Sequence, residues 1–372
     1  MRLALVISSL AHPGGAERVV SMMASYWARG GHSVSVLTLD DAKESFYELD
    51  SRVARVGLNR LGESRALGEA IVNNARRVSE LRKAVASTRP DALISFIDVT
   101  NVLALLGASG LNVPVIVSER VHPPAHSTGQ PWVTLRRVLY PRAAAVVVQT
   151  RGTRAWAETF VPRSRIHVVP NPVVVANRGD SAGITLPREA RTIAAMGRLD
   201  PQKGFDLLIR AVAQCDAIGP HDRLVILGEG SERARLEQLI ADLGLRGRVE
   251  LRGVVNDPGT VLRDADVFVL SSRYEGFPNA LLEAMANGVA VVSYDCPHGP
   301  ADIIEHERTG LLVPNGDVPA LAHTIARVLN NESLRKAIAA SAQEVTSRYS
   351  IDSVMKEWSR VIGAATYGGR WN

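Results

Sequence analysis

The sequence predicts an α/β protein built from two doubly wound domains in tandem, and three features of the chain predict it. Short apolar runs alternate with amphipathic stretches along almost the whole chain, which is typical of parallel strands joined by helices. This rhythm pauses once, between Asn171 and Arg191, where prolines and glycines occur without a period. The 372 residues also exceed the usual size of one domain.

The first domain is expected over residues 1–176. A Gly-Gly break precedes its first helix, and Arg89-Pro90 ends its second. The predicted strands are 3–8, 33–39, 91–96, 113–118 and 144–149, and the predicted helices are 16–29 and 64–86.

The second domain is expected over residues 192–347 and repeats the alternation. The predicted strands are 192–196, 223–227, 248–251, 266–270 and 290–293, and the predicted helices are 205–214, 232–243, 278–287, 318–329 and 332–347. A last helix is predicted beyond this domain, over 351–362. Ligands of such folds bind at the carboxyl ends of the strands. With two domains, we expect them to face each other across a cleft that holds the ligand.

The composition excludes several classes of protein. With 46% hydrophobic and 22% charged residues the chain is an ordinary globular one, and no stretch approaches the roughly 20 apolar residues of a membrane span. Two distant cysteines, Cys215 and Cys296, exclude a disulfide framework and a zinc site and suit a reducing cytoplasm. The start of the chain could be a signal peptide, but the early His-Pro-Gly-Gly loop favours a first buried strand.

The first half of the chain is basic. Residues 1–180 hold 22 Lys and Arg against 14 Asp and Glu, while the whole chain carries +5. Such an excess indicates an anionic partner, either nucleic acid, a phosphate-bearing ligand or an acidic membrane face, with a merely solvated arginine-rich surface as the alternative. The cations that cluster in two segments are Arg76, Arg77, Arg82, Lys83, Arg136 and Arg137.

The stretch after the predicted strand 266–270 carries the strongest chemical signal. Glu275 stands in the loop, and Glu283 follows inside a helix that Pro278 is expected to open as its first residue. The start of that helix directs its amide groups toward the strand ends, where phosphate binds well. Carboxylates repel phosphate but accept hydrogen bonds from sugar hydroxyls, so the pair indicates a nucleotide-sugar; a solvated loop glutamate and an ordinary helix glutamate are the alternative.

The stretch after strand 192–196 supplies the matching cations. Arg198 and Lys203 stand on either side of a turn at a strand end, so both can reach a diphosphate there, although an ordinary basic turn has the same pattern. The Gly228-x-Gly230 turn lacks the third small residue of a dinucleotide site, because Arg233 stands there, which excludes NAD and FAD. Its two glycines are expected to let backbone approach a nucleotide.

Three weaker motifs remain. Gly14-Gly15 either approaches a diphosphate or is a plain strand-to-helix turn. Glu119, Arg120 and His122 end a strand of the first domain, where they either bind and deprotonate an acceptor or form a satisfied ion pair. Asp264-Ala265-Asp266 matches a metal-binding pattern, but it precedes a strand and therefore points away from the strand ends, so we predict no metal.

Taken together in their order, these motifs resemble those of the retaining glycosyltransferases of family four, which have two Rossmann-like domains in the GT-B arrangement. The resemblance covers nearly the whole chain and rests on Gly14-Gly15, Gly197–Gly204, Gly228–Gly230 and the Glu-x7-Glu pair Glu275 and Glu283. Ser-Glu-Arg at 118–120 and the stretch 295–300 resemble the branch that acts on lipid-linked polysaccharide or O-antigen intermediates. The chain departs from that branch at 121–123, where Val-His-Pro replaces Asn-Asp-Pro.

The resemblance implies a metal-independent glycosyltransferase without a cofactor. It implies that Glu275 contacts the transferred sugar, Glu283 the ribose, and Arg198 and Lys203 the leaving diphosphate, and that the C-terminal helix, within 351–372, packs on the first domain. The acceptor residues are Glu119, Arg120 and His122. The implied donor-binding residues are Gly14, Gly15, Arg198, Lys203, Gly228, Gly230, Glu275, Gly276, Phe277, Pro278, Asn279, Ala280, Leu281 and Glu283.

The expected donor is a UDP-linked N-acetylhexosamine or hexose, and the expected acceptor is a glycan or a lipid-linked glycan. GDP-mannose is the alternative donor. An epimerase, a phosphorylase and a non-catalytic scaffold that binds sugar nucleotides are the alternatives to a transferase. We expect a cytoplasmic protein that rests peripherally on an anionic membrane through the basic half, with no nucleic-acid partner.

Overall fold

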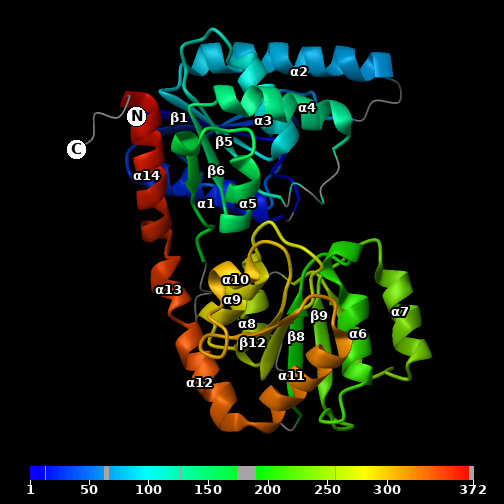
Figure 1. Ribbon diagram of the computed structural model, residues 1–372. Helices are drawn as coiled ribbons and strands as arrows, with labels where there is room; N and C mark the ends of the chain where they lie inside the picture. Colours follow the sequence, from blue (N-terminus) through cyan, green and yellow to red (C-terminus); the bar gives the residue numbers. More distant parts are fainter. Residues whose placement is uncertain are drawn as a thin grey trace. The chain divides into compact units, whose positions relative to one another are not determined.

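The computed structural model describes residues 1–12, 14–62, 67–121, 123, 125, 128–173, 190–255 and 257–367. The chain divides into two compact units (Figure 1). The first contains Met1–Asn171 together with the C-terminal stretch from Val354, and the second contains Pro172–Ser353. The chain therefore passes from one unit to the other twice. Most of the pause predicted in the alternation, residues 174–189, lies outside the described residues.

The first unit is built on a parallel sheet of seven strands in the order β3-β2-β1-β4-β5-β6-β7. The interior strand β1 pairs with β2 on one side, with Leu5 opposite Val36, and with β4 on the other, with Leu5 opposite Ile94. Its apolar runs are buried on both faces, as parallel sheets require. The strands are β1 (Arg2–Ile7), β2 (Ser33–Thr38), β3 (Ala54–Gly57), β4 (Ala92–Phe96), β5 (Val115–Ser118), β6 (Ala145–Val148) and β7 (Ile166–Val168).

Helices cover both faces of this sheet. In Figure 1, α2, α3 and α4 lie together on one side, and α1 and α14 on the other. Trp358 of α14 is fully buried and packs edge-on against Trp27 of α1, with ring centroids 6.4 Å apart. It also packs at a tilt against Phe96, with centroids 6.2 Å apart. The helices are α1 (Gly15–Arg29), α2 (Leu67–Thr88), α3 (Asp98–Gly107), α4 (Gln130–Leu139), α5 (Arg151–Ala157) and α14 (Ile351–Tyr367).

The second unit repeats the plan with six parallel strands in the order β10-β9-β8-β11-β12-β13. The strands are β8 (Thr192–Met196), β9 (Arg223–Leu227), β10 (Val249–Gly253), β11 (Val267–Leu270), β12 (Ala290–Asp295) and β13 (Leu311–Pro314). The helices are α6 (Phe205–Ala213), α7 (Arg233–Asp242), α8 (Pro258–Arg263), α9 (Asn279–Ala286), α10 (Pro300–Ile303), α11 (Val318–Asn330), α12 (Glu332–Ala342) and α13 (Val345–Arg348). The helices α6, α7 and α11 pack on one face of the sheet, and α8 and α9 pack on the other.

The predicted fold class, two doubly wound α/β domains, is confirmed, and the differences concern short elements. The edge strands β3, β7 and β13 have three or four residues each and were not expected from the sequence. The predicted helix 332–347 is wrong as one element, because it breaks at Gln343–Glu344 into α12 and α13. The unexpected helix α3 is buried almost all round, so its sequence carries no amphipathic period.

Each sheet has one place where the strand order reverses direction, between β1 and β4 in the first unit and between β8 and β11 in the second. Helices leave adjacent strands toward opposite faces at such a point, which opens a crevice outside the carboxyl ends of the strands. These two crevices are where ligands of each unit are expected. Among the described residues, no helix combines the length and apolarity that crossing a bilayer requires.

Candidate active site

The predicted cation Lys203 and the predicted catalytic carboxylate Glu275 come together at the reversal point of the second sheet. The strand β8 runs into the loop 197–204, and its neighbour β11 runs into the loop 271–278. Arg198 and Lys203 belong to the first loop and Glu275 to the second. The sheet order therefore makes neighbours of two segments that are separated by about 70 positions in the chain.

Hydrogen bonds between backbone and side chains join the two loops. The Arg273 amide donates to the Gln202 carbonyl at 2.8 Å, and Gln202 Nε2 donates back to the Tyr274 carbonyl at 3.0 Å. The Ser271 hydroxyl donates to the Lys203 carbonyl at 2.9 Å. These contacts hold the chain on both sides of Lys203 and Glu275, so the two side chains are positioned before any ligand arrives.

Gly204 allows the loops to approach this closely. It adopts the left-handed region at φ 61°, and a Cβ at this position would lie 2.2 Å from the Ser271 carbonyl oxygen. Any side chain would push the two loops apart and would also strain the backbone. The glycine that follows Lys203 is thus required by the packing of the two loops, whereas Lys203 itself is explained by its charge.

Lys203 and Glu275 form a nearly buried ion pair. Lys203 Nζ lies 2.7 Å from Glu275 Oε1, and the side chains are 17% and 4% exposed. The Ser272 hydroxyl donates to the same Oε1 at 2.6 Å. Among the described residues Oε2 receives no hydrogen bond, so this oxygen can accept one from a ligand hydroxyl.

Arg198 lies apart from this pair. Its side chain is 72% exposed and makes an ion pair with Asp200 at 3.2 Å. Asp200 also accepts the Lys203 amide and caps the short turn before Gly204. Arg198 therefore stands at the rim of the strand-end site, where it is free to change its orientation toward an anion.

The helix after Glu275 begins one residue later than predicted. Pro278 is the N-cap, with ψ 78°, and Asn279 is the first residue of α9, so the expectation that Pro278 opens the helix is wrong. Phe277 is 7% exposed and packs against Tyr349 with ring centroids 6.2 Å apart, and Leu281 is fully buried in the core. Of the predicted stretch Gly276–Leu281, only Asn279 and Ala280 are partly exposed, so any ligand contact by the others is through their backbone.

Glu283 lies in the second turn of α9 and is 8% exposed. Its carbonyl accepts a hydrogen bond from Asn287 Nδ2 at 2.8 Å. A carboxylate with so little exposed surface is costly to bury without a function or partners. This burial distinguishes Glu283 from the ordinary solvated helix glutamate that the sequence left open.

The structure gives Gly228 and Gly230 a packing role. A Cβ at Gly228 would lie 1.9 Å from the Gly197 carbonyl oxygen, and a Cβ at Gly230 would lie 2.3 Å from that of Leu199. Neighbouring backbone thus lies where a Cβ would stand, so the packing of these turns requires glycine at both positions. Arg233, at the place of the third glycine, pairs with Glu229 at 2.5 Å.

In the first unit, Gly14 and Gly15 stand where the chain enters α1 after β1. Gly14 is the N-cap of that helix with extended backbone, and Gly15 is its exposed first residue. Both belong to the connection that leaves the reversal point of the first sheet. His122, the third predicted acceptor residue, lies outside the residues that the structure describes.

Glu119 and Arg136 belong to a buried polar network and are not on the surface. Glu119 is 1% exposed, accepts a hydrogen bond from the Tyr140 hydroxyl at 2.9 Å, and lies 3.5 Å from the Arg136 guanidinium, which also faces Asp98 at 3.7 Å. Glu119 is therefore paired with Arg136 and not with the adjacent Arg120. For Arg136 this geometry corrects the expectation of a surface cation, because the side chain is 4% exposed.

Arg120 is also buried. Its guanidinium lies over the rings of Phe96, at 5.0 Å, and Trp358, at 5.8 Å, and donates to Asn171 Oδ1, which also accepts from Gln149. Burial lowers the pKa of Arg120 to about 9. The side chain therefore contacts β4, α14 and Asn171, the residue at which the chain leaves the first unit for the second.

Sequence reasoning missed the groups that support Glu275. Ser272, Gln202 and Asp200 gave no signal of their own, because serine, glutamine and aspartate are common in loops. Cys296 was noted only for its redox meaning. Burial raises the pKa of its thiol well above the usual range, and the nearby Glu275 carboxylate adds to this effect, so the thiol stays protonated beside the site.

The Asp264-Ala265-Asp266 pattern, which was not expected to bind a metal, lies at the amino ends of the strands, away from the site. Asp264 ends α8, and Asp266 accepts the Thr192 amide at 2.9 Å at the start of β8. Within the part of the chain that the structure describes, no three His, Cys, Asp or Glu side chains are grouped so that they could hold a metal ion.

Comparison with protein families gives two matches that follow each other along the chain. Residues 14–172 match the family described as Glycosyl transferase 4-like domain, and residues 179–345 match the family described as Glycosyl transferases group 1. The two matches correspond closely to the two structural units.

Similar proteins match nearly the whole chain. A Campylobacter jejuni GalNAc-alpha-(1->4)-GalNAc-alpha-(1->3)-diNAcBac-PP-undecaprenol alpha-1,4-N-acetyl-D-galactosaminyltransferase is 30% identical over 97% of this chain and 98% of its own length. The Erwinia amylovora amylovoran biosynthesis glycosyltransferase AmsD is 24% identical over 97% and 99%. Among solved structures, Thermosynechococcus elongatus sucrose-phosphate synthase superposes with a TM-score of 0.84 at 20% identity over 98% and 99%, and Anabaena HepE in complex with UDP with 0.78 at 20% over 98% and 100%.

Proposed function

The chain belongs to family four of the glycosyltransferases, with the two-domain GT-B architecture, and from this premise we propose that it transfers an N-acetylhexosamine or hexose from a UDP-sugar to a lipid-linked glycan. We further propose that transfer retains the anomeric configuration and needs no metal ion. The product would be an intermediate of polysaccharide or lipopolysaccharide biosynthesis.

The observation that carries this proposal is the ion pair between Lys203 and Glu275 at the reversal point of the second sheet. It places one cation and one carboxylate 2.7 Å apart, between loops that are fixed to each other. A nucleotide-sugar presents a diphosphate and a hydroxyl-bearing ring on adjacent atoms. Lys203 suits the diphosphate, and Glu275 Oε2 suits a hydroxyl of the sugar.

Departure of the nucleoside diphosphate is the difficult step of such a transfer. Negative charge grows on the β-phosphate while the sugar becomes oxocarbenium-like, so a fixed cation beside the phosphate stabilises the transition state. Lys203 is such a cation, Arg198 can join it from the rim, and the amide groups of the first turn of α9 face developing negative charge favourably. Glu283 would hold the ribose.

Retention is proposed from the resemblance of the motifs to those of the retaining family, and Glu275 is suited to another task in that transfer than nucleophilic attack. Its Oε1 already accepts hydrogen bonds from Lys203 and Ser272, and this reduces the nucleophilicity of the carboxylate. Departure and attack on the same face of the sugar then need no covalent intermediate. Product stereochemistry, read by NMR from the anomeric coupling of the transferred sugar, tests this point.

Similar proteins support UDP and N-acetylhexosamine as the donor. The Campylobacter relative is named as an N-acetyl-galactosaminyltransferase, and HepE has been solved with UDP and with UDP-glucose. The test is a screen of UDP-linked and GDP-linked sugars that measures released nucleoside diphosphate. Release from a UDP-sugar, lost in Lys203→Met, is the expected result. Release from GDP-mannose alone would favour a mannosyltransferase, and binding without any release would favour a scaffold.

Metal independence is tested by turnover in excess EDTA. Positive charge at the site comes from Lys203, Arg198 and the start of α9, so we expect unchanged rates. Loss of activity that manganese restores would contradict the proposal. It would indicate a metal site, for which Asp264 and Asp266 are the candidates.

We also propose that the first unit rests on an anionic membrane, where a lipid-linked acceptor resides. Arg76, Lys83 and Arg137 are exposed on α2 and α4. Val72 stands one helical turn before Arg76 and is 48% exposed, and Val138 follows Arg137 and is 50% exposed. Cations that neighbour exposed apolar side chains suit the interface of a bilayer. Arg77, by contrast, donates to the Arg60 and Gly62 carbonyls.

Vesicle flotation tests this surface. Replacing Arg76, Lys83 and Arg137 together by Gln should weaken binding to anionic vesicles roughly 100-fold at low salt, since each cation near the surface contributes about 1 kcal/mol. A control triple variant, with Gln at Arg154, Arg163 and Arg223, removes the same charge from elsewhere. Equal binding of the wild type to neutral and anionic vesicles would contradict the proposal.

A further inference from the structure

Arg273 joins the two loops of the candidate active site through its side chain as well as through its backbone. It stands two positions before Glu275, and its guanidinium donates to both oxygens of the Asp206 carboxylate, at 2.9 and 2.8 Å. The same guanidinium donates to the Pro201 carbonyl at 2.7 Å. Lys203 lies between these two partners in the sequence. One side chain from the Glu275 loop is therefore attached on both sides of Lys203.

The turn from Pro201 to Asp206 is shaped to receive this side chain. A Cβ at Gly204 would lie 3.4 Å from Arg273 Nη1, so the guanidinium lies directly against the turn. Asp206 belongs to the first turn of α6, whose apolar face packs in the core of the second unit. The carboxylate that Arg273 binds is thus held by a rigid element, and the contact fixes the loop 271–278 relative to that element.

The backbone of Arg273 is held from a third direction. Asn315, which directly follows β13, donates from Nδ2 to the Arg273 carbonyl at 3.1 Å. The amide, the carbonyl and the side chain of Arg273 all have partners, and two of the three bind the segment around Lys203. A displacement of Arg273 would therefore also displace the loop that carries Lys203.

The pair between Arg273 and Asp206 is charged and directional. Burial raises the pKa of the Asp206 carboxyl, but the hydrogen bonds and the charge of Arg273 more than offset this effect, so that pKa lies below its ordinary value. The hydrogen bonds to Asp206 raise the pKa of Arg273 in turn. A bidentate pair of this kind fixes an orientation as well as a distance. A lysine in the place of Arg273 would supply only one point charge.

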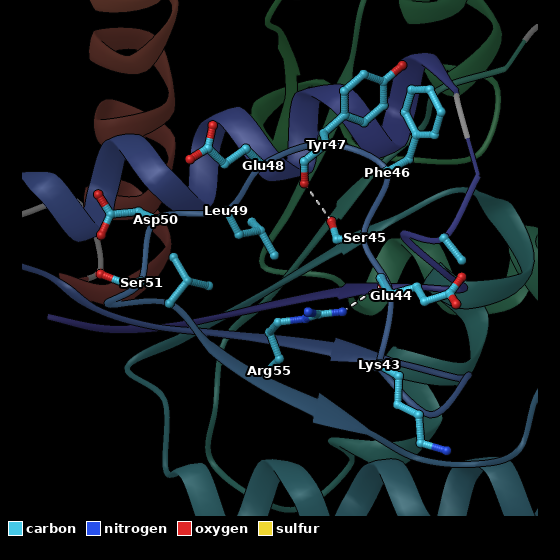
Figure 2. Close-up of a pocket in the computed structure, with 12 residues that line it drawn as sticks. Lys43, Glu44, Ser45, Phe46, Tyr47, Glu48, Leu49, Asp50, Ser51 and Arg55 are labelled. Atoms are coloured by element: carbon cyan, nitrogen blue, oxygen red, sulfur yellow. Dashed lines mark hydrogen bonds between the residues drawn. The ribbon is translucent and has the colours of Figure 1, made fainter.

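Comparison with another arginine that anchors a loop shows what is particular to Arg273. Arg55 of β3 donates to the Glu44 carbonyl at 2.6 Å, across the connection between β2 and β3, beside the pocket that Figure 2 shows. The carboxylates there do not converge, because Glu44 and Glu48 point to opposite sides of the connection. Arg55 thus secures one irregular connection, whereas Arg273 joins two segments that each carry a predicted site residue.

We propose that Arg273, paired with Asp206, is a positioning residue for the transfer reaction, because it sets the separation between the Lys203 and Glu275 side chains. This inference rests on the proposed function, since it assigns to Arg273 the precision of that site. Arg273 acts through Lys203 and Glu275 and does not itself contact the reacting atoms. A shift of about 1 Å in a group that acts at the transition state can lower turnover on the order of 10²-fold.

The first experiment needs no ligand. Urea unfolding of the wild type, Lys203→Met, Glu275→Gln and the double variant measures the coupling between the two side chains, and the same set is then made with Arg273→Met. We expect a coupling of about tenfold in the unfolding equilibrium constant with Arg273 present, and of less than about threefold without it. Absence of coupling with Arg273 present, or equal coupling in both sets, would overturn the inference.

The second experiment measures turnover as release of UDP from the donor. Arg273→Met should lower kcat by about 10-fold to 100-fold and change UDP affinity by less than about threefold, because the fault lies in the alignment of groups that act as charge develops. Arg273→Lys should restore only part of kcat, since lysine cannot bind both Asp206 oxygens and the Pro201 carbonyl together. Asp206→Asn breaks the same pair from the other side and should also lower kcat.

Arg191→Met is the matched control. Arg191 pairs with Asp222 at 2.6 Å and is 32% exposed, close to the 38% of Arg273, but it stands directly before β8, at the amino end of that strand. It should lower the melting temperature and leave both the coupling and kcat unchanged. Equal kcat in Arg273→Met and Arg191→Met would overturn the inference. Failure of the wild type to bind UDP contradicts the proposed function instead, whereas the unfolding experiment tests the role of Arg273 independently of any ligand.

Discussion

Replacing Glu275 by Gln should separate donor affinity from turnover. In the free enzyme Lys203 Nζ lies 2.7 Å from Glu275 Oε1, so part of the positive charge meant for the diphosphate is already neutralised. The side-chain amide introduced by the substitution would keep the shape and could still accept hydrogen bonds from Lys203 and Ser272. It would lack the negative charge that competes with a diphosphate for Lys203 and that repels the diphosphate.

The magnitude follows from the burial of the pair. A hydrogen bond to a charged group contributes about 1.5–3 kcal/mol. Lys203 keeps 17% exposure, and water screens it to that extent, so the lower end of the range applies. About 1.5 kcal/mol corresponds to roughly tenfold tighter binding of free UDP. Turnover should fall on the order of 10²-fold, because the contact to the sugar is needed as charge develops on it.

Calorimetric titration with UDP and steady-state release of UDP from the donor measure the two quantities. Lys203→Met should bind UDP more weakly than wild type, and the double variant should resemble Lys203→Met, because the two side chains act on the ligand as one unit. Glu237→Gln is the matched control, since it removes another glutamate that pairs with an arginine, on α7 of the same unit.

Two results would refute this reasoning. Weaker UDP binding by Glu275→Gln would mean that the carboxylate itself helps to hold the nucleotide. Unchanged UDP binding together with full turnover would mean that the pair between Lys203 and Glu275 only supports the loops.

Three further predictions concern other parts of the molecule. Glu283→Gln should raise KM and weaken UDP binding with a smaller change in kcat, because a ribose contact is made before and during reaction alike; a loss of kcat alone would contradict this. Gly228→Ala should lower the free energy of unfolding by about 2 kcal/mol or more in urea titrations, since its Cβ would lie 1.9 Å from the Gly197 carbonyl oxygen. Burial lowers the pKa of His167 and His298, so the unfolded chain binds protons at a higher pH than the folded chain does. The stability of the folded chain is therefore complete above about pH 6.5 and should decline as the pH falls below that value. Denaturation at pH 7.5 and 5.5 measures this decline, and replacing both histidines by Gln should reduce it.

The sequence was sufficient for the fold because the strands that build it are strongly apolar. Runs such as 192–196 and 223–227 end at glycines and charged residues, so their boundaries are visible without a structure. The three-residue strand β7 and the four-residue strand β3 have too few residues to show a period, and they become strands only through their neighbours in the sheet.

The site could be predicted in its chemistry but not in its contacts. Lys203 and Glu275 were recognised as a cation and a carboxylate at strand ends, yet their contact depends on β8 lying beside β11. The burial of Glu119 and Arg136 could not be foreseen, because their network closes only when α4 packs near the end of β5. Charged residues after a strand look alike in sequence whether they face solvent or one another.

The return of the chain to the first unit has a consequence for biosynthesis. Trp358 of α14 covers Trp27 and Phe96, but a ribosome makes it only after the whole second unit. Until then the first unit has an open apolar surface where α14 will dock, and Arg120 lacks one of the two rings that enclose it. The unit that is synthesised first is thus completed last, and during that interval it is the part of the nascent chain most exposed to aggregation or to capture by chaperones.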